Sequence, residues 1–522
     1  MKPILTFLFF WIALLQYQLK AQNPSKTSFV DTVKVDKKVP NVTHPSIKYL
    51  QTDIYDILQA PELANATVGI SIQNVESGES FYKINPNTSL IPASTLKLFT
   101  TAAALDALGP DFRFTTRLYI QGIIKPSGEL DGNIIVRASG DPTMSVFFYK
   151  DPLIIMDNIA LALDSIGVKS IKGNIIIDYS YFDNQEYGPG WAIDDITFPY
   201  SAPVSAISFY DNKVDVSIKP ALKVGDVARL TQSPENHFVR IVNNVITAEP
   251  GSPTIIYSEK DQRSSVIDIH GAISNPSMDD KASGKIADKQ YTLGVAVDNP
   301  SQYFLHLLRM RLEKMGIRIR GTLLDNEHLD DPIDYMGLQV FYSIVSPPLA
   351  DIIKVINKHS HNLAAEMLFK TIAKENTGEG SYEKAAEYMR KFIARMGIMP
   401  ENCSIVDGSG LSRLNLMSAQ QQTTLLSTIY RSSMRDSFYA SLAVPGEKGT
   451  LSNRLTKSLA EKHVHAKTGS MNNVSCLSGY ITTRDNEVLA CSIMINGFTV
   501  PDSIIQNIQD IICMRLASFS RK

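Results

Sequence analysis

Hydrophobic residues recur along this chain with two different periods, and each stretch of constant period outlines one element. Apolar residues three or four positions apart predict a helix over 49–58, and alternation predicts strands over 66–73 and 80–83. A second helix is predicted to start at Pro92 and to stop at Gly109. The first part of the folded chain is therefore expected to mix helices and strands.

The end of the chain repeats this mixture. A long helix is predicted to begin at 346–348 and to continue through Met367, because apolar residues keep a helical spacing across this stretch. Strands are then predicted over 463–467, 476–482 and 487–496. A final helix over 503–516 is predicted to follow them.

The middle of the chain contains a unit that occurs twice. Residues 161–177 and 308–324 each indicate a helix, then a glycine, then a strand interrupted at Gly173 or Gly321. Two copies do not make a solenoid. They indicate that 111–334 forms α+β subdomains of its own.

The N-terminus has the pattern of a secretory signal peptide. Lys2 precedes an apolar run over 4–15, and a polar stretch then ends at Ala21, so 1–21 is predicted to be removed. The run is shorter than the roughly 20 residues that a transmembrane helix needs. We therefore expect an exported product with no membrane anchor, beginning with a flexible polar segment over 22–44.

Composition restricts the class of protein. With 522 residues, 44% of them hydrophobic and 20% charged, the chain is expected to be globular, with more than one domain. A net charge of −2 provides no excess of cations for nucleic acid, so no nucleic-acid partner is expected. The four cysteines are too few for a disulfide scaffold and are expected in the core. The sequence leaves open whether one pair of them is oxidised.

Three short motifs carry candidate chemistry. In chain order they are Ser94-Thr95-Leu96-Lys97, Ser360-His361-Asn362 and Lys467-Thr468-Gly469. Each motif alone is a weak signal, because such short patterns arise by chance. Their contexts agree with one mechanism, since the first is at a helix start, the second is inside a predicted helix and the third ends a strand.

The residue types suit nucleophilic catalysis by a serine. The Ser94 hydroxyl needs a base, and Lys97 can serve if burial or a nearby cation lowers its pKa. Lys467 would be that cation and would also attract an anionic substrate terminus. Ser360 would pass the proton to the leaving amine.

The remaining motif residues suit substrate binding. Thr468 can donate to a carboxylate, and Asn362 can bind the substrate amide. The backbone N–H groups of Ser94 and Ser470 would form an oxyanion hole, because Gly469 lets the strand edge approach the substrate.

These motifs resemble those of the serine D-alanyl-D-alanine carboxypeptidases, specifically the low-molecular-mass class C penicillin-binding proteins. Ser94 and Ser360 are 266 positions apart, as in that class, where two extra domains separate the first two motifs. Three further segments also match, namely 139–143 (SGDPT), 191–203 (WAIDDITFPYSAP) and 407–413 (DGSGLSR).

The resemblance implies an α/β (α+β) fold, with an antiparallel sheet covered by helices on both faces. Residues 45–110 and 335–522 would form the transpeptidase-like catalytic domain. Residues 111–334 would form two inserted subdomains, with about 119–185 nested within the rest. The resemblance further implies that Arg413 contacts substrate and that Asp195 helps to recognise a diaminopimelate side chain. His361 departs from the family, where this position is often Asp.

The implied function is that of an exported serine-type D-Ala-D-Ala carboxypeptidase in the periplasm or cell envelope, with D,D-endopeptidase activity as a possible addition. Its partners would be peptidoglycan stem peptides and β-lactams, and it would need no cofactor. No metal is expected either, because His463 and His465 have no carboxylate or cysteine nearby to complete a ligand set. The alternatives are a non-catalytic β-lactam or peptidoglycan binding module and a β-lactamase on the same fold.

Overall fold

The computed structural model describes residues 44–261, 264–275 and 290–522. The predicted signal peptide and all but His44 of the predicted flexible segment lie outside these residues. Within the described ranges, no helix is both long enough and apolar enough to cross a membrane.

A five-stranded antiparallel sheet forms the base of the fold. Its strands, in spatial order, are β16 (Val464–Met471), β17 (Val474–Thr482), β18 (Val488–Asn496), β1 (Thr67–Asn74) and β2 (Ser80–Ile84). Alternate residues of β1 and β18 face opposite sides, so Ile70 and Ile493 join one core and Met494 joins the other. Both faces of the sheet are therefore buried.

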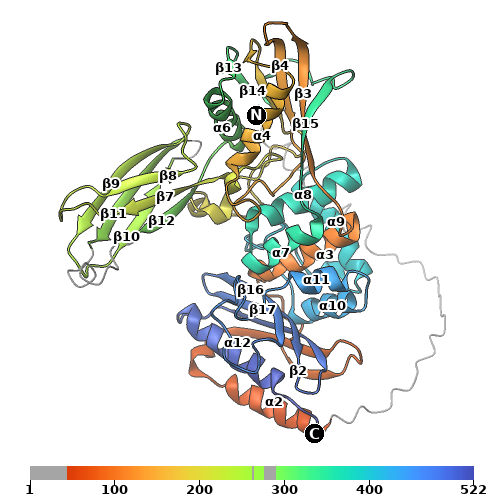
Figure 1. Ribbon diagram of the computed structural model, residues 1–522. Helices are drawn as coiled ribbons and strands as arrows, with labels where there is room; N and C mark the ends of the chain where they lie inside the picture. Colours follow the sequence, from red (N-terminus) through yellow and green to blue (C-terminus); the bar gives the residue numbers. More distant parts are fainter. Residues whose placement is uncertain (1–43, 262–263, 276–289) are drawn as a thin grey trace, which may run out of the picture. The chain divides into compact units, whose positions relative to one another are not determined.

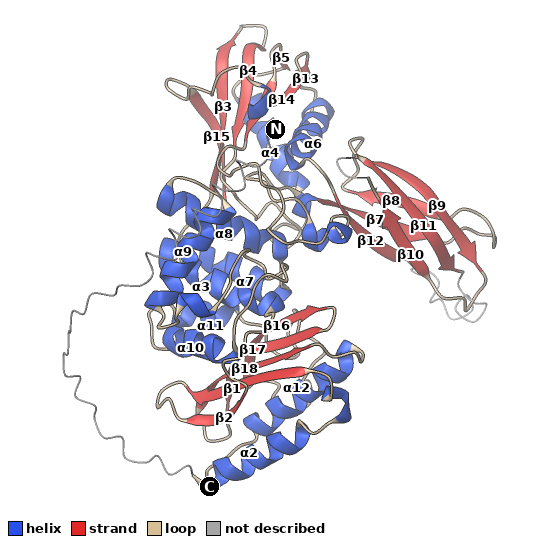
Figure 2. Ribbon diagram, turned by 180° about the vertical axis from the view of Figure 1, so that it is seen from behind, coloured by secondary structure: helices blue, strands red, loops and turns tan. Residues whose placement is uncertain are grey.

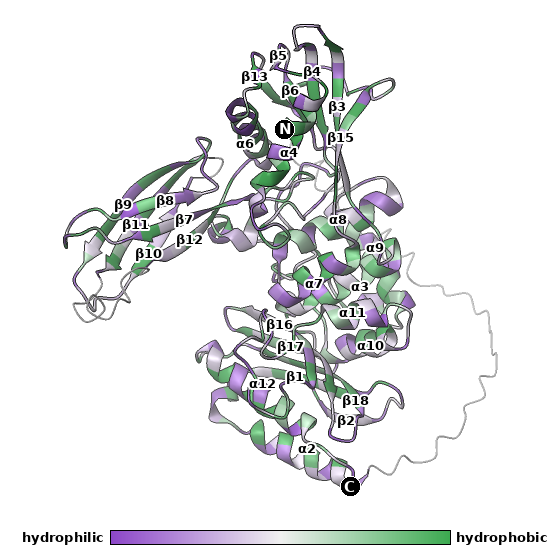
Figure 3. Ribbon diagram, viewed as in Figure 1, coloured by the Kyte–Doolittle hydropathy of each residue, from purple (hydrophilic) through white to green (hydrophobic). Residues whose placement is uncertain are grey.

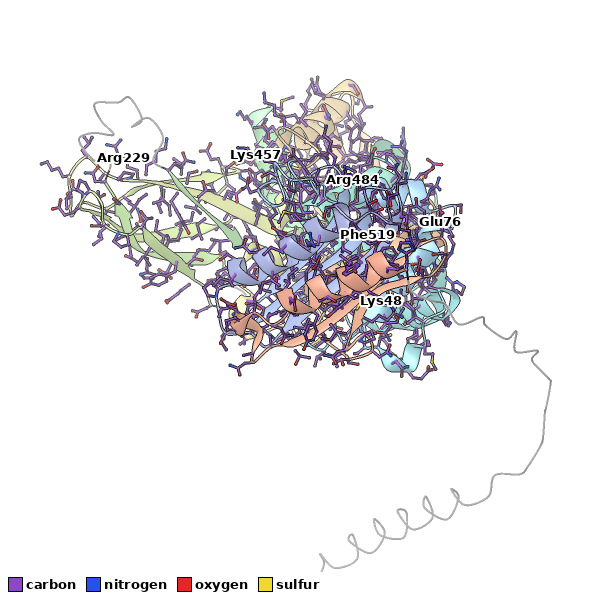
Figure 4. All side chains as sticks on the ribbon, turned by 90° about the horizontal axis from the view of Figure 1, so that it is seen from below. Lys48, Glu76, Arg229, Lys457, Arg484 and Phe519 are labelled. Atoms are coloured by element: carbon purple, nitrogen blue, oxygen red, sulfur yellow. The ribbon has the colours of Figure 1, made fainter. Side chains whose placement is uncertain are left out.

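Helices cover each face, as the sequence predicted. Figure 2 shows α2 (Pro45–Ile57) and α12 (Asp502–Ala517) on one side of the sheet, with α10 (Ala419–Tyr430) and further helices on the other. Figure 4 looks onto the first two helices, with Lys48 on α2 and Phe519 just after α12. The further helices are α3 (Lys97–Leu108), α7 (Leu349–His359), α8 (Asn362–Thr377), α9 (Tyr382–Arg395) and α11 (Arg435–Ser441).

Helix α3 lies in the centre of these layers. All nine residues from Lys97 to Leu105 are buried, as expected of a helix that is apolar on almost every side. A 3₁₀ turn, η2 (Ala93–Leu96), precedes it and contacts β16 and β17. The predicted second helix therefore starts with a 3₁₀ turn that carries Ser94.

The long helix predicted to run through Met367 is wrong as a single element. It is two helices, α7 and α8, separated at Ser360, which has left-handed backbone angles (φ 58°, ψ 40°). The side chain of His361 caps the second helix by accepting from the backbone N–H of Ala364. Periodicity concealed the break because apolar spacing continues across it.

A seven-stranded sheet forms the upper part of Figure 1. Its strands are β3 (Thr115–Ile124), β4 (Glu129–Arg137), β5 (Ser170–Ile171), β6 (Ile175–Asp178), β13 (Arg318–Ile319), β14 (Leu323–Asp325) and β15 (Gln339–Val345). Helices α4 (Leu153–Ser165) and α6 (Pro300–Lys314) contact each other beside it. Figure 3 shows that α4 is largely hydrophobic, whereas α6 carries more hydrophilic residues.

The two copies of the sequence repeat lie side by side in this sheet. Strand β13 pairs parallel with β5, and β14 pairs parallel with β6. The strands approach closely at the glycines, because a Cβ on Gly321 would lie 2.0 Å from the carbonyl oxygen of Gly173. The repeat therefore builds one half of the sheet from matching units.

Two three-stranded sheets complete the inserted region. One contains β7 (Lys213–Lys219), β8 (Arg229–Ser233) and β12 (Tyr291–Ala296), and the other contains β9 (Arg240–Ala248), β10 (Ile255–Glu259) and β11 (Val266–Ser274). In chain order these strands lie between the two groups that form the seven-stranded sheet, whereas the sequence suggested 119–185 as the nested part. The domain boundaries themselves stay a prediction.

The remaining short elements are 3₁₀ turns. They are η1 (Pro61–Leu63), η3 (Ile193–Asp195), η4 (Pro199–Ser201), η5 (Tyr210–Asn212), η7 (Asn326–His328) and η8 (Pro400–Asn402). The cysteines are all unpaired, with Cys476, Cys491 and Cys513 buried as expected and Cys403 only half-buried.

Candidate active site

The three sequence motifs meet where η2, the α7–α8 break and β16 come together. Ser94 lies in η2, Lys97 begins α3, and Ser360 and Asn362 lie on either side of His361. The approach of β16 is close, since a Cβ on Gly469 would lie 2.8 Å from the Pro92 oxygen and 3.1 Å from the Ser94 nitrogen. Only a glycine fits there without displacing backbone.

Each lysine of the motifs donates to a serine hydroxyl. Lys97 Nζ lies 2.9 Å from Ser94 Oγ and 2.7 Å from Asn362 Oδ1. Lys467 Nζ lies 2.9 Å from Ser360 Oγ and 2.7 Å from the carbonyl oxygen of Thr468. Ser94 is thus within hydrogen-bonding reach of Lys97, as the predicted architecture requires.

Both lysines are fully buried, and no carboxylate of the described residues forms an ion pair with either. Burial lowers the pKa of Lys97 to about 7, although the more distant Glu366 and Asp407 oppose the shift. Burial, and then the charge of Lys97, hold the pKa of Lys467 well below its usual value. Lys97 is therefore poised to exchange a proton near neutral pH.

The buried carboxyl group of Glu366 positions the Ser409 carbonyl, which is the third hydrogen-bond partner of Lys97. Glu366 accepts the backbone N–H of Gly408 (2.8 Å) and of Ser409 (2.7 Å), and the Ser409 carbonyl accepts from Lys97 (2.7 Å). Burial, and then the nearby Asp407, raise the pKa of Glu366 to about 8. Sequence reasoning gave Glu366 no role. The signal available was an acidic residue in an apolar stretch, one helical turn after Asn362.

Asp407 organises the same loop. It accepts the backbone N–H groups of Gly410 (2.8 Å) and Ser412 (2.7 Å) and the indole N–H of Trp191 (3.0 Å). Two of the segments that carried the family resemblance, 191–203 and 407–413, therefore contact each other directly.

A cavity of about 780 Å³ opens onto these groups. The predicted residues that line it are Ser94, Ser360, Asn362, Ser470, Arg413 and Asp195. Lys97, Lys467 and Gly469 are buried, and Thr468 is half-buried. Six of the ten predicted site residues therefore line the cavity, and Lys97, Lys467 and Gly469 lie directly against Ser94 or Ser360.

Arg413 and Asp195 are held from different parts of the chain. Arg413 donates to the carbonyl oxygen of Asn472 (2.9 Å), beyond the end of β16. Asp195 accepts from the hydroxyl of Tyr200 (2.8 Å), and the carbonyl oxygen of Tyr200 accepts from Asn362 Nδ2 (2.8 Å). The inserted region thus contributes Asp195 and Tyr200 to the cavity wall.

The sequence also left Asp502 without a role. This residue begins α12, lines the cavity and accepts from the Ser470 hydroxyl at 2.7 Å. The contact links the first turn of α12 to the strand that carries the third motif.

The chain matches known proteins along most of its length. A family model described as "D-Ala-D-Ala carboxypeptidase 3 (S13) family" matches residues 50–518. The chain is 31% identical over 483 residues to a D-alanyl-D-alanine carboxypeptidase of Actinomadura sp. (strain R39), covering 90% of this chain and 85% of that protein. It is 28% identical over 458 residues to D-alanyl-D-alanine carboxypeptidase DacB of Haemophilus influenzae, covering 87% of this chain and 90% of that protein.

A solved structure has the same fold. The crystal structure of penicillin binding protein 4 (dacB) from Haemophilus influenzae superposes with a TM-score of 0.76 at 25% identity, covering 90% of this chain and all of that chain (100%).

Proposed function

The chain belongs to the D-Ala-D-Ala carboxypeptidase 3 (S13) family, and on that premise we propose that Ser94 is the nucleophile of a serine-type D-Ala-D-Ala carboxypeptidase. The observation that carries the assignment is the 2.9 Å contact between Ser94 Oγ and Lys97 Nζ at the cavity wall. A lysine with a pKa of about 7 is neutral in a large fraction of molecules at neutral pH, and so can accept a proton.

Acylation would proceed in two proton transfers. Neutral Lys97 takes the Ser94 proton as Oγ attacks the carbonyl carbon of the penultimate D-Ala, and the oxyanion accepts from the N–H groups of Ser94 and Ser470. The C–N bond then breaks, and Ser360, held 2.9 Å from Lys467, passes the proton that Lys97 took up on to the leaving D-Ala amine, so that Lys97 is neutral again and Lys467 keeps its charge. Water subsequently hydrolyses the acyl-enzyme and restores Ser94.

Substrate recognition would use both sides of the cavity. Lys467 and Thr468 would bind the carboxylate next to the scissile bond, because they provide a cation and a hydroxyl on β16. Arg413 and Asp195 would contact the rest of a peptidoglycan stem peptide, with Asp195 accepting from the free amine of a diaminopimelate side chain. The predicted signal peptide and this substrate together support a place in the periplasm or cell envelope.

We also propose a division of the chain into a catalytic domain and an inserted region. Residues 45–110 and 335–522 would form the catalytic domain, and 111–334 the inserted subdomains. The contact of Tyr200 with Asn362 supports a role for the inserted region in shaping the substrate cavity.

Penicillin and mass spectrometry test the proposal. A stable adduct on Ser94 that is absent from Ser94→Ala, together with release of D-Ala from a pentapeptide by the wild-type protein, would support the carboxypeptidase. Rapid turnover of penicillin without a stable adduct would indicate a β-lactamase. Penicillin binding without an adduct or turnover would indicate a binding module.

A further inference from the structure

Three consecutive residues of the inserted region have left-handed backbone angles. The φ values of Tyr210, Asp211 and Asn212 are 54°, 57° and 51°, and none of the three is glycine. Such a conformation costs on the order of 1–3 kcal/mol per residue and persists only where the surroundings hold it. Strain of this kind concentrates at functional sites.

The surroundings do hold this turn. The backbone N–H of Tyr210 donates to the carbonyl oxygen of Met144 (2.8 Å), and the Asn212 amide donates to the carbonyl oxygen of Pro203 (2.9 Å). All three residues of the turn are buried. The conformation is therefore fixed by contacts on both sides of Asp211.

The turn presents the Asp211 carboxylate to His361. Asp211 Oδ1 lies 3.0 Å from His361 Nε2, and the side chains are only 8% and 10% exposed. His361 Nδ1 accepts from the backbone N–H of Ala364 at 3.1 Å, so it carries no proton. The ring proton is therefore on Nε2 and points at Asp211.

His361 is the link between the second motif's two side chains. Its preceding residue, Ser360, meets Lys467, and its following residue, Asn362, meets Lys97. A rotation of the imidazole would release the cap of α8 and move Ser360 and Asn362 together. The ring of Phe147 packs edge-on against His361 at 5.0 Å, which limits that rotation from one further side.

We propose that Asp211 is a positioning residue of the peptidase reaction. By accepting the Nε2 proton, it keeps His361 in the tautomer that caps α8 and so holds Ser360 and Asn362 against the two lysines. Asp211 does not contact the substrate and acts through His361. The inference rests on the proposed function, because its effect is on the acylation of Ser94.

The test compares variants that remove or keep the acceptor. Asp211→Leu removes it at similar size, and Asp211→Asn retains an acceptor oxygen. Asp157→Asn is the control, because Asp157 forms an ion pair with Arg311 (2.7 Å to Nε) between α4 and α6, away from the cavity. Penicillin acylation is followed by stopped flow, which separates the reversible binding constant from the acylation rate constant, and thermal unfolding is measured alongside.

We expect Asp211→Leu to lower the acylation rate constant by about 10- to 100-fold, the effect of a small misplacement of reacting groups, with little change in penicillin binding. Asp211→Asn should retain most of the rate, and Asp157→Asn should lower only the melting temperature. A wild-type rate in Asp211→Leu, or a loss confined to stability as in Asp157→Asn, would overturn the proposal.

The His361 tautomer provides a readout that does not depend on activity. Nitrogen NMR of the full wild-type chain should show a proton on Nε2 and none on Nδ1, a pattern that Asp211→Asn should keep, whereas in Asp211→Leu the Nδ1–H form should become populated. A wild-type ring protonated on Nδ1 would overturn the proposal even if Asp211→Leu fails to fold. If penicillin does not acylate the wild-type protein, the proposed function fails, whereas the tautomer still tests the Asp211–His361 contact.

Discussion

Two buried lysines lie at helix α8 in different surroundings, since Lys97 of α3 meets the first residue of α8 and Lys370 lies near the middle of that helix. At its N-terminal end, Asn362 meets Lys97, a buried lysine that has no carboxylate within ion-pair distance among the described residues. Two turns further on, the equally buried Lys370 has Asp183 at 2.5 Å, and its Nζ lies 4.8 Å from the Tyr382 ring centre.

The difference shows which buried charge is available for chemistry. Burying a lysine without an anion costs free energy, and the protein reduces that cost by releasing the proton. Asp183 reduces this cost at Lys370, where burial lowers the pKa and the carboxylate opposes the shift. At Lys97 no ion pair offsets the cost of burying a charged amine, so its pKa falls to about 7 and the neutral amine can act as a base.

The largest expected effect comes from removing the unpaired lysine. Lys97→Ala should lower the rate of penicillin acylation by about 10²- to 10⁴-fold, because the Ser94 proton loses its acceptor. The melting temperature should stay the same or rise, since an uncompensated buried amine is gone. Near wild-type acylation would show that another group is the base.

The second largest effect on activity is expected from Lys467→Ala. It should weaken turnover of substrates ending in a free carboxylate by about 2–5 kcal/mol, the cost of losing one partner of a desolvated charge pair. A pentapeptide whose terminal carboxylate is replaced by an amide is the matched substrate. An equal loss on both peptides would contradict carboxylate binding and leave the hydrogen bond that holds Ser360 as the role of Lys467.

Removing Asp183, the ion-pair partner of Lys370, should affect stability and not catalysis. Asp183→Ala leaves Lys370 buried beside Tyr382 without its anion, so the free energy of unfolding should fall by about 1–3 kcal/mol. Asp183 is 33% exposed, which keeps the effect below that of a fully buried pair. Acylation per folded molecule should not change, and a catalytic loss above tenfold would contradict the distinction between Lys97 and Lys370.

The same comparison predicts a pH dependence. With a Lys97 pKa of about 7, the acylation rate should fall about tenfold for each pH unit below this value, because only neutral Lys97 accepts the proton.

The free energy of unfolding should rise with pH between about pH 7 and pH 10.5. Between pH 7 and the ordinary lysine pKa of about 10.5 the unfolded chain holds a proton on Lys97 that the folded chain has released. Lys97→Met should flatten this part of the stability profile. An unchanged profile in that variant would show that Lys97 titrates normally.

The smallest effect is expected at the rim of the cavity. Asp195→Ala should weaken turnover only of substrates with a second amine, by about 1 kcal/mol or less, because the carboxylate is partly solvated. A diaminopimelate pentapeptide, the same peptide with its side-chain amine blocked, and a cross-linked dimer separate the cases, and the dimer also measures endopeptidase activity. Equal losses on all three would assign Asp195 to its contact with Tyr200 alone.

The sequence by itself determined the layers of the fold and the members of the three motifs. The alternation in β1, the apolar run of β18 and the apolar content of α3 are local properties, and they predict burial wherever the neighbours lie. The motifs were recognisable for the same reason, since Ser94 and Lys97 share one helical turn and Lys467 directly precedes Thr468 and Gly469.

Only the tertiary structure decided how these residues are held. The Ser409 carbonyl meets Lys97 across 312 positions, and Asp211 meets His361 across 150. No local pattern specifies such pairs, because a buried polar group can be satisfied by any part of the chain that the fold brings to it. The break at Ser360 was hidden for the same reason, since its left-handed turn is stabilised by contacts that periodicity does not contain.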